Sequence, residues 1–286
     1  QLADLRHRFG QIPMMALTAT ATDRVRADIV SQLRLQEPAR FIASFNRPNL
    51  QYRVTPRRSA LRQVLEVIGK HDGESGIVYC NSRNGTERLA ARLKENGVEA
   101  APYHAGMDAA ARSRNQEAFI RDDLQVICAT IAFGMGIDKP DVRFVIHQDL
   151  PKNLEGYYQE TGRAGRDGLS ADCVLLFNAA DVTKQTGFIE EKDDEHERAV
   201  SRQLLQKMVH YAESRQCRQR VLLDYFSEKF EEENCRACDN CLEPKETFDG
   251  TEAAQKLLAC IYRVREHGGF SVGLNHIVDI LCGADT

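Results

Sequence analysis

Short apolar runs alternate with amphipathic segments over the first 180 residues of the chain. Runs of this length are typical of buried strands, and they lie at residues 14–17, 41–43, 76–80, 100–103, 125–128, 144–147 and 173–177. Helical spacing of apolar residues marks the segments between them, at 23–33, 61–70, 86–96, 109–121 and 154–161. This alternation predicts an α/β fold, in which a parallel sheet carries helices on both faces. Ligands bind such sheets at the carboxyl ends of the strands, so we expect functional residues in the loops that follow them.

The pattern changes beyond residue 177, where helices follow one another without strands. Charged amphipathic segments predict helices at 179–191, 196–213 and 217–226, and a polar run at 228–234 leads into closely spaced cysteines. A further helical pattern starts at residue 252 and resumes at 271–281 after a pair of glycines. We therefore expect three parts: an α/β domain at 1–180, a small helical module at 181–245 and a third module at 246–286.

The composition is that of an ordinary globular protein, with 42% hydrophobic and 28% charged residues. No apolar run reaches the roughly 18 residues that a membrane span needs, and the first residues lack the apolar segment of a signal peptide. The formal net charge of −4 argues against a chain-wide attraction to nucleic acid, so such contact must come from local patches. Together with an odd number of cysteines, these features predict a reducing, cytoplasmic location and no membrane partner. The chain begins with Gln1 instead of Met, which suggests a fragment of a longer protein.

The nine cysteines fall into two groups. Some occupy apolar runs or helix positions that predict burial: Cys80, Cys128, Cys173, Cys260 and Cys282. The others are clustered among polar residues: Cys217, and the Cys-x-x-Cys-x-x-Cys run of Cys235, Cys238 and Cys241. Four thiolates at this spacing suit a tetrahedral zinc ion, although an iron–sulfur cluster uses the same set of ligands. A closed four-ligand site has no open coordination position, so its expected role is structural.

Residues 159–168, Gln-Glu-Thr-Gly-Arg-Ala-Gly-Arg-Asp-Gly, form the strongest motif of the chain. Its arginines, Arg163 and Arg166, lie three residues apart, so on a helical turn they project from one face. A guanidinium group donates to two phosphate oxygens at once, and an arginine supplied across a cleft accelerates phosphoryl transfer by about 10³–10⁵-fold. A solvated glycine-rich turn is the alternative for Gly-Arg-Ala-Gly-Arg alone, and the length of the whole motif argues against it.

Two further loops suit contact with phosphate groups. Asn81, Ser82 and Arg83 form a polar turn between a predicted strand and the next helix, where backbone N–H groups and a hydroxyl are available. Ser82 is also a suitable N-cap for that helix, and the two roles are compatible. Thr130 comes soon after the predicted strand at residues 125–128, so it also lies in a loop at the end of a strand. Gly136 in this loop allows a close approach of the backbone to a ligand.

Residues 159–168 resemble motif VI of superfamily-two helicases, in the form found in the RecQ family. Other segments resemble motifs that precede it in that family: residues 16–21 (motif III), 45–49 (the start of the second motor domain), 78–83 (motif IV), 103–106 (the segment after it) and 129–140 (motif V). The cysteine set resembles the RecQ zinc domain, which favours zinc over an iron–sulfur cluster. Residues 246–286 resemble the beginning of the RecQ winged-helix domain, and they are too short to form all of it.

The resemblance implies that residues 1–180 contain a second RecA-like helicase domain. It implies that Arg163 and Arg166 are arginine fingers that face ATP held by the other motor domain, and that Gln159 couples hydrolysis to domain movement. Gly136 and Asp138 are then expected near the nucleotide. Residues implied to contact the backbone of one DNA strand are Asn81, Ser82, Arg83, His104 and Thr130. For His104 a structural role is the more common one, because a single histidine after a strand is usually a packed residue.

A P-loop, Gly-x-x-x-x-Gly-Lys-(Ser/Thr), is absent from the sequence, and so is a suitably placed Asp-Glu-x-His box. We therefore expect no ATP hydrolysis by this chain alone. For the full-length protein the resemblance implies ATP- and Mg²⁺-dependent 3′-to-5′ unwinding of DNA in recombination and repair, at single-strand/duplex junctions. Repair proteins and single-strand-binding proteins are then expected partners, and in a bacterium the nucleoid is the expected place. Two alternatives stay open: a non-enzymatic, zinc-stabilised nucleic-acid-binding module, and an RNA helicase, against which motif VI and the cysteines argue.

Overall fold

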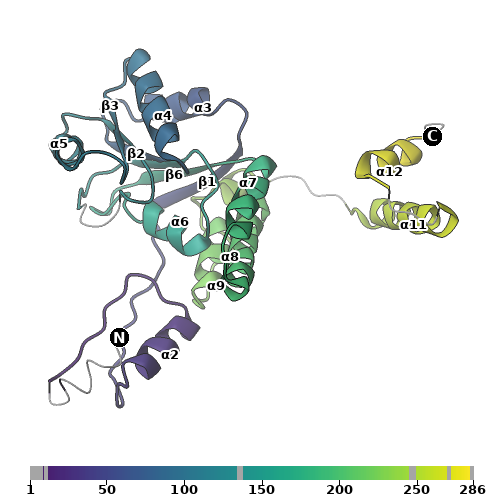
Figure 1. Ribbon diagram of the computed structural model, residues 1–286, viewed down its shortest axis with the longest axis horizontal. Helices are drawn as coiled ribbons and strands as arrows, with labels where there is room; N and C mark the ends of the chain where they lie inside the picture. The colour runs from purple at the N-terminus through teal and green to yellow at the C-terminus, as the bar shows by residue number, and fades with distance from the viewer. Residues whose placement is uncertain (1–8, 10–11, 134–137, 245–248, 269–271, 284–286) are drawn as a thin grey trace. The chain divides into compact units, whose positions relative to one another are not determined.

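The computed structural model describes residue 9 and residues 12–133, 138–244, 249–268 and 272–283. The chain divides into two compact units, Gln1–Pro244 and Lys245–Thr286. Figure 1 shows the ribbon of both units. Their helices are α2 (Asp23–Gln32), α3 (Ala60–Lys70), α4 (Arg83–Glu95), α5 (Ala109–Ile120), α6 (Leu154–Thr161), α7 (Ala179–Glu190), α8 (Glu195–Glu213), α9 (Arg218–Tyr225), α10 (Asp239–Leu242), α11 (Thr251–Gly268) and α12 (Leu274–Leu281).

A six-stranded sheet, parallel throughout and ordered β1-β6-β5-β2-β4-β3, forms the centre of the first unit. Its strands are β1 (Leu50–Pro56), β2 (Gly76–Tyr79), β3 (Ala100–Tyr103), β4 (Val126–Ala129), β5 (Phe144–His147) and β6 (Ala171–Phe177). Tyr79 at the end of β2 pairs with Ala129 of β4 and with His147 of β5, and Tyr103 of β3 pairs with Ala129. The loops after these four strands therefore leave the sheet along one edge.

Helices cover both faces of this sheet, as the sequence predicted (Figure 1). On one face, α3 and α4 bury Val64, Ile68 and Leu89 against alternate strand residues such as Val78. On the other face, α6 and α8 pack over a second buried cluster, to which α5 contributes Phe119. Because successive side chains of a strand point to opposite faces, a sheet buried on both sides needs apolar residues at every position. This requirement explains the short apolar runs that made five of the strands visible in the sequence.

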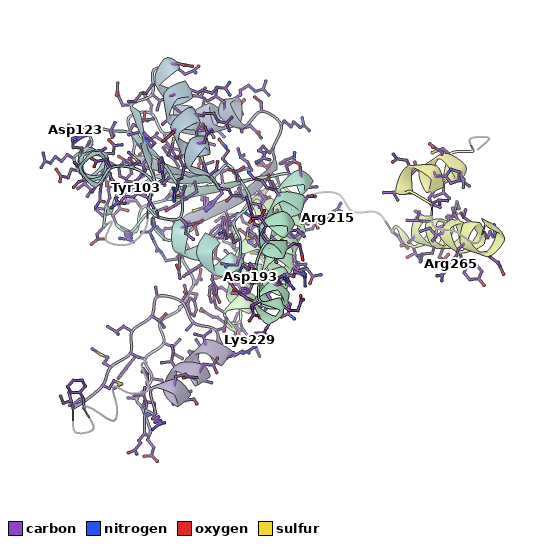
Figure 2. All side chains as sticks on the ribbon, in the orientation of Figure 1. Tyr103, Asp123, Asp193, Arg215, Lys229 and Arg265 are labelled. Carbon is purple, nitrogen blue, oxygen red and sulfur yellow. The ribbon has the colours of Figure 1, made fainter. Side chains whose placement is uncertain are left out.

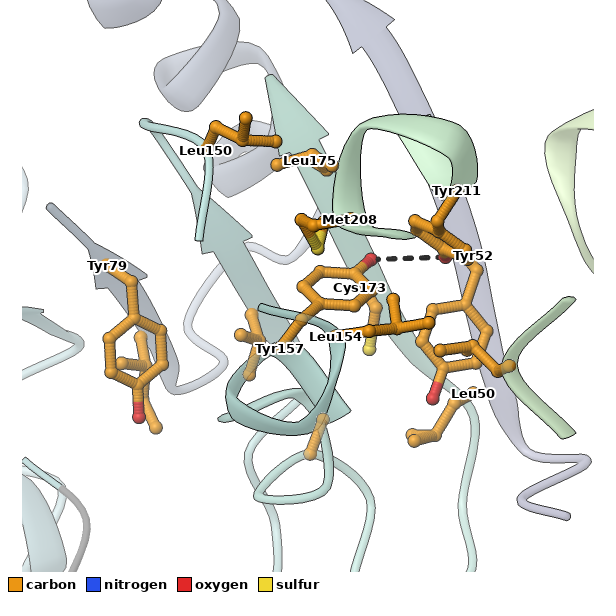
Figure 3. Packing of buried hydrophobic residues seen from close by; sticks show 14 of the residues in the cluster. Leu50, Tyr52, Tyr79, Leu150, Leu154, Tyr157, Cys173, Leu175, Met208 and Tyr211 are labelled. Carbon is orange, nitrogen blue, oxygen red and sulfur yellow. Dashed lines mark hydrogen bonds between the residues drawn. The ribbon is translucent and has the colours of Figure 1, made fainter. Parts of the chain in front are cut away.

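The helices that follow the sheet share its core. Met208 and Tyr211 of α8 lie in one buried cluster with Tyr157 of α6 and with strand residues such as Leu175. The hydroxyl of Tyr211 donates to the hydroxyl of Tyr157 at 3.4 Å, and both rings are fully buried (Figure 3). Cys217 at the start of α9 belongs to the same cluster. The helical segment after residue 178 is therefore packed onto the sheet through a common apolar layer.

The predictions for the N-terminal stretch were partly wrong. Residues 14–17 and 41–43 are irregular instead of strands, and Met15, Leu17 and Phe41 are 80%, 84% and 95% exposed. These runs have no neighbouring strand to pair with, so their apolar character produces no sheet. Conversely, β1 was missed because polar residues interrupt its apolar pattern. As an edge strand it buries Leu50 and Tyr52 almost fully, and Gln51 between them only in part.

The second unit consists of α11 and α12. Cys260 and Ile277 are buried in it, at 9% and 4% exposure. Cys282, predicted as a core residue, is exposed because it follows the last turn of α12. Other apolar side chains of this unit are exposed: Leu258, Ile261, Tyr262, Leu274, Val278 and Leu281. Within the described ranges, no helix has both the length and the apolar character to cross a lipid bilayer.

Ile127 and Ile131 allow a matched test of the core, because they are four residues apart and 0% and 69% exposed. Ile127→Ala should lower the free energy of unfolding by about 2–5 kcal/mol, since it removes buried methylene groups and leaves a cavity. Ile131→Ala should change it by less than about 0.5 kcal/mol. Urea unfolding followed by circular dichroism measures both, and equal effects of the two substitutions would contradict the assignment of β4 to the core.

His71 should make the stability of the first unit pH-dependent. Its ring nitrogens contact Glu74 at 2.7 Å and Asp172 of β6 at 3.0 Å, and the hydrogen bond with Asp172 raises the pKa of His71 above its usual value. A raised folded-state pKa means that the stabilisation is fully present below about pH 6.5 and is lost as the pH rises through the folded-state value. His71→Gln should therefore destabilise the protein more at pH 5.5 than at pH 8.5, as thermal melts at both pH values would record. A pH-independent difference would argue against this pairing.

Candidate functional site

The turn after α6 carries the arginine pair. Asn153 caps the start of α6, since its side-chain oxygen accepts a hydrogen bond from the N–H of Gly156 at 2.7 Å. After α6 the chain turns through residues 162–168 before it enters β6, and Arg163 and Arg166 lie in this turn. The arginines are thus placed by a capped helix on one side and by a buried strand on the other.

Arg163 is half-buried beside the end of β2. Its Nε is buried and has no hydrogen-bond partner among the described residues. Burial raises the pKa of Tyr79, and the nearby guanidinium of Arg163 opposes that rise. The hydroxyl of Tyr79 donates to the carbonyl oxygen of Phe133 at 3.0 Å, in the loop after β4. A buried donor without an acceptor lowers the stability of a fold by about 1–3 kcal/mol. An anionic group that accepts a hydrogen bond from this guanidinium would remove that cost.

Arg166 forms an ion pair with Asp138, with 2.6 Å between Nη1 and Oδ1. The side chain of Arg166 is 32% exposed and that of Asp138 is 90% exposed. The structure therefore brings together two residues that the sequence placed near a nucleotide. An exposed pair of this kind stabilises the fold by only about 0–1 kcal/mol, so a phosphate group can compete for the guanidinium. Gly136, the third predicted nucleotide contact, lies outside the described residues.

Gln159 of α6 joins two segments that are far apart in the sequence. Its Nε2 donates to the hydroxyl oxygen of Thr20 at 2.8 Å. Thr20 belongs to residues 16–21, the first of the helicase-like motifs. The two motifs are thus in direct contact, which is the geometry that a coupling role for Gln159 requires.

Asn81 and Thr130 line a cavity of about 130 Å³ at the carboxyl edge of the sheet. Lys152, Asp149 and Glu160 are among the other residues that line it. The donors of Asn81 are engaged internally, because its N–H donates to Asp149 Oδ2 at 3.0 Å and its Nδ2 to the Leu150 oxygen at 3.2 Å. The expectation that the Asn81 N–H is available to a phosphate is therefore wrong for this conformation.

Ser82 and Arg83 lie at the start of α4. Ser82 is the N-cap, and its hydroxyl accepts from the N–H of Gly85 at 3.0 Å. The side chain of Arg83 lies against Gly106, where an added Cβ would be only 2.9 Å from the Arg83 Cδ atom. The absence of a side chain at Gly106 therefore leaves space for the side chain of Arg83. Residues 78–83 and 103–106, two of the helicase-like segments, are in contact here. The first N–H groups of a helix lack intrahelical partners, and Ser82 satisfies one of them.

His104 lies below the surface. It is 3% exposed, and its Nε2 is 3.0 Å from Glu87 Oε1, while Nδ1 is buried without a partner among the described residues. These contacts agree with a structural role for His104. At this place the side chain of Glu87 is exposed and that of His104 is not. Thr130 is half-buried, and its N–H donates to the carbonyl oxygen of Tyr103 at 3.2 Å.

Two buried polar pairs near the cavity were missed by the sequence analysis. His147 Nε2 lies 2.7 Å from Glu160 Oε2, with the histidine 1% exposed. Arg57 bridges Asp149 and Asp181 at 2.9 and 2.6 Å, and burial raises the pKa of Asp181. These residues come from separate strands, helices and loops, so no local spacing in the sequence connects them. A polar residue at the end of an apolar run, such as His147, was the one available signal.

The four clustered cysteines converge as predicted. The sulfur atoms of Cys217, Cys235, Cys238 and Cys241 all lie within 4.8 Å of one another. Backbone N–H groups point at two of them: that of Arg218 at Cys238 Sγ (3.4 Å), and that of Cys238 at Cys235 Sγ (3.3 Å). Donors of this kind are the usual outer partners of metal-bound ligands.

The acidity of these thiols shows why they suit a cation. Hydrogen bonds from Cys235 and Cys238 lower the pKa of Cys217, whereas the hydrogen bond with Cys217 raises the pKa of Cys235. Burial raises the pKa of Cys241 to about 11. One thiolate therefore suppresses ionisation of its neighbours, and a divalent ion relieves this conflict because it coordinates all four sulfur atoms as thiolates.

Arg218 connects the cysteine cluster to the sheet. It is 2% exposed, and its Nε donates to Asp239 Oδ1 at 2.9 Å, while Asp239 Oδ2 accepts from the N–H of Val54 in β1. The guanidinium of Arg218 is buried in internal hydrogen bonds, so it is not available to a phosphate group in this conformation. Arg215 is exposed (Figure 2), and Arg220 donates to the carbonyl oxygen of Glu232.

Three family models match successive stretches of the chain. They are the Helicase conserved C-terminal domain at residues 57–168, RecQ zinc-binding at 179–242 and the RQC domain at 244–286. With the convergent sulfur atoms, the second match identifies the cysteine set as a structural zinc site.

Curated proteins are similar over nearly the whole chain. ATP-dependent DNA helicase RecQ of Pasteurella multocida is 44% identical over 99% of this chain and 44% of that protein, and its Bacillus subtilis counterpart is 42% identical over 95% and 45%. RecQ-like DNA helicase BLM of Xenopus laevis is 49% identical over 84% of this chain and 19% of that protein. The chain thus spans less than half the length of these relatives.

Among solved structures, S. cerevisiae Dbp5 bound to RNA and ADP BeF3 has a TM-score of 0.51 and 19% sequence identity. The likeness covers 66% of this chain and 54% of that chain. At this level of identity it shows a common fold alone, and it agrees with the RecA-like sheet predicted from the sequence.

Cys238→Ser should abolish stoichiometric zinc binding, because Cys238 is fully buried at the centre of the cluster. The melting temperature should fall by several degrees, since each kcal/mol lost lowers it by roughly 2–4 °C in a domain of this size. Metal analysis and thermal melts measure both effects. Cys282→Ser is the control, because Cys282 is exposed and outside the cluster. Unchanged zinc content in Cys238→Ser would contradict the assignment of this ligand.

Proposed function

We propose that the chain belongs to the RecQ family and forms the C-terminal part of the motor of an ATP-dependent DNA helicase. The relatives that match nearly the whole chain bear this name. In this proposal, residues 1–180 are the second RecA-like domain, 181–245 the zinc-binding domain and 246–286 the beginning of a winged-helix domain. The parent enzyme unwinds DNA in the 3′-to-5′ direction with energy from ATP hydrolysis.

The arrangement of Arg163, Arg166 and Asp138 carries this proposal. A half-buried guanidinium with an unused donor lies in the same turn as a second guanidinium that is held by an exposed carboxylate. Both arginines are then able to donate to the phosphates of ATP that the other motor domain holds with Mg²⁺. Gln159, in contact with Thr20, transmits the state of the nucleotide between the two domains.

We assign the DNA backbone contacts to the edge of the sheet where the loops after β2, β3 and β4 meet. Ser82, Arg83 and Thr130 present a capped helix start and a polar loop to a phosphate. Asn81 contributes through the second N–H of its side-chain amide, since its backbone N–H and one amide N–H already donate to Asp149 and Leu150. His104 acts indirectly in this proposal, because it contacts the side chain of Glu87 and not the DNA. We therefore expect a substitution of His104 to change the affinity for DNA only slightly.

The remaining expectations follow from this role. A helicase motor works at junctions between single-stranded and duplex DNA, so repair and single-strand-binding proteins are the partners that we propose. The place of action is where the chromosome lies, which in a bacterium is the nucleoid in the cytoplasm. Zinc serves the fold of the helical module and takes no part in hydrolysis.

A non-enzymatic nucleic-acid-binding module is the second candidate. The ion pair of Arg166 with Asp138 favours it, because this guanidinium already has an internal partner. The half-buried Nε of Arg163 without an acceptor among the described residues favours the motor, since a binding module has no need of a buried unsatisfied donor.

Arg166→Ala decides between the two candidates in the full-length helicase that we propose contains this chain. DNA-stimulated ATP hydrolysis should fall by about 10³-fold or more, because the guanidinium neutralises charge that develops only in the transition state. Arg114→Ala on α5 is the matched control, since Arg114 is exposed and remote from the turn. This chain alone should show no DNA-stimulated hydrolysis. Full activity of Arg166→Ala would remove the motor interpretation and leave the binding module.

A further inference from the structure

Residues 45–49 precede β1 and have no role so far, although they resemble the start of a motor domain. In the structure the side chain of Arg47 crosses to the turn after α6. Its Nη2 donates to the carbonyl oxygens of Ala164 at 3.1 Å and Gly165 at 2.9 Å, and its Nη1 to that of Gly162 at 3.5 Å. One guanidinium therefore engages three carbonyl oxygens of this turn, one before Arg163 and two between Arg163 and Arg166.

Asn49 binds the same turn from beside Arg47. Its Nδ2 donates to the carbonyl oxygens of Gly165 and Leu169, both at 2.8 Å. The carbonyl oxygen of Asn49 also accepts from the N–H of Ala171, the first residue of β6, at 3.0 Å. The segment is thus anchored to the sheet while its side chain holds the turn.

The turn itself leaves little freedom at its centre. Gly165 has a φ of +54°, and its N–H donates to the carbonyl oxygen of Val142 at 2.9 Å. A Cβ atom on Gly165 would lie 2.5 Å from Asn49 Nδ2 and 2.6 Å from the oxygen of Leu169. Glycine is therefore required here both by its backbone conformation and by the closeness of Asn49.

The chemistry of Arg47 suits this location. The three carbonyl groups that it contacts lie beyond the last residue of α6, outside the ladder of intrahelical hydrogen bonds, so a planar group with several donors satisfies them well. Lysine has the same charge, but it lacks the fixed fork that reaches several oxygens at once. Arg47 is half-buried, and the hydrogen bonds of its side chain in the described part of the chain all end on this turn.

We infer that Arg47 and Asn49 are positioning residues for hydrolysis: they fix the backbone of residues 162–165 so that Arg163 and Arg166 project together toward the nucleotide. The inference rests on the proposed function. An error of about 1 Å in the placement of a reacting group can cost about 10²-fold in rate, so a support for the turn is as important as the fingers themselves.

Arg47→Lys in the full-length helicase tests the inference. The kcat for ATP should fall by about 10- to 100-fold with little change in the KM for ATP, because the lost interaction acts only on the transition state. Binding of ADP with aluminium fluoride, which mimics the transferring phosphoryl group, should weaken by a similar factor, while binding of ADP alone stays unchanged. Zinc content and melting temperature should stay near those of the unsubstituted protein.

Two further variants make the result decisive. Asn49→Asp keeps the size of the side chain but turns its donors into acceptors that face carbonyl oxygens, so it should reproduce the loss of kcat. Arg58→Lys is the control, because Arg58 is exposed and makes only a backbone contact to Gln63. The inference is wrong if Arg47→Lys weakens the binding of ADP and of ADP–aluminium fluoride equally. It is also wrong if the loss of kcat is explained by a smaller fraction of folded protein. If Arg166→Ala keeps full activity, the proposed function itself fails, whatever Arg47→Lys does.

Discussion

Burial of Tyr157 between the sheet and α8 is the contact on which both functional regions depend. Tyr157 lies on α6, which leads directly into the turn of Arg163 and Arg166, and it meets Tyr211 of α8, which precedes the zinc ligand Cys217. Both tyrosines are fully buried in the cluster that fills this face of the sheet. Because packed interiors resist small displacements, this contact fixes the arginine turn and the start of the metal site against one rigid support.

Polar groups near the arginine turn are held in internal pairs that differ in strength. His147 with Glu160 and the Arg57 bridge are largely buried, so breaking them leaves charges or donors without partners, which is costly. The pair of Arg166 with Asp138 is exposed and weak by comparison. The structure thus combines a stiff polar framework with an exposed ion pair that is broken at small cost. Under the proposed function, this difference suits a site that is completed only when another domain supplies its ligand.

The zinc module is held against the sheet by an ion pair and a hydrogen bond to the backbone of β1. Buried Arg218 follows the ligand Cys217, and its partner Asp239 follows the ligand Cys238 and accepts from the backbone of β1. Metal binding therefore orders the residues that dock the module on the edge strand. Loss of zinc is expected to loosen this edge as well as the module, since the ligands and the docking pair are adjacent in the chain.

The sequence by itself determined the α/β class, five of the six strands and the four clustered cysteines, and for the arginine pair it supplied a prediction. These features depend on local patterns: apolar runs for strands buried on both faces, and residue types at fixed spacing for metal and phosphate chemistry. Only the tertiary structure decided that residues 41–43 form no strand, that β1 does, and that His104 and Arg218 are buried. It also decided that Arg47 and Asn49 hold a turn more than a hundred residues away in the chain. Burial and such distant hydrogen bonds depend on which segments become neighbours, and a single sequence does not contain that information in any local pattern.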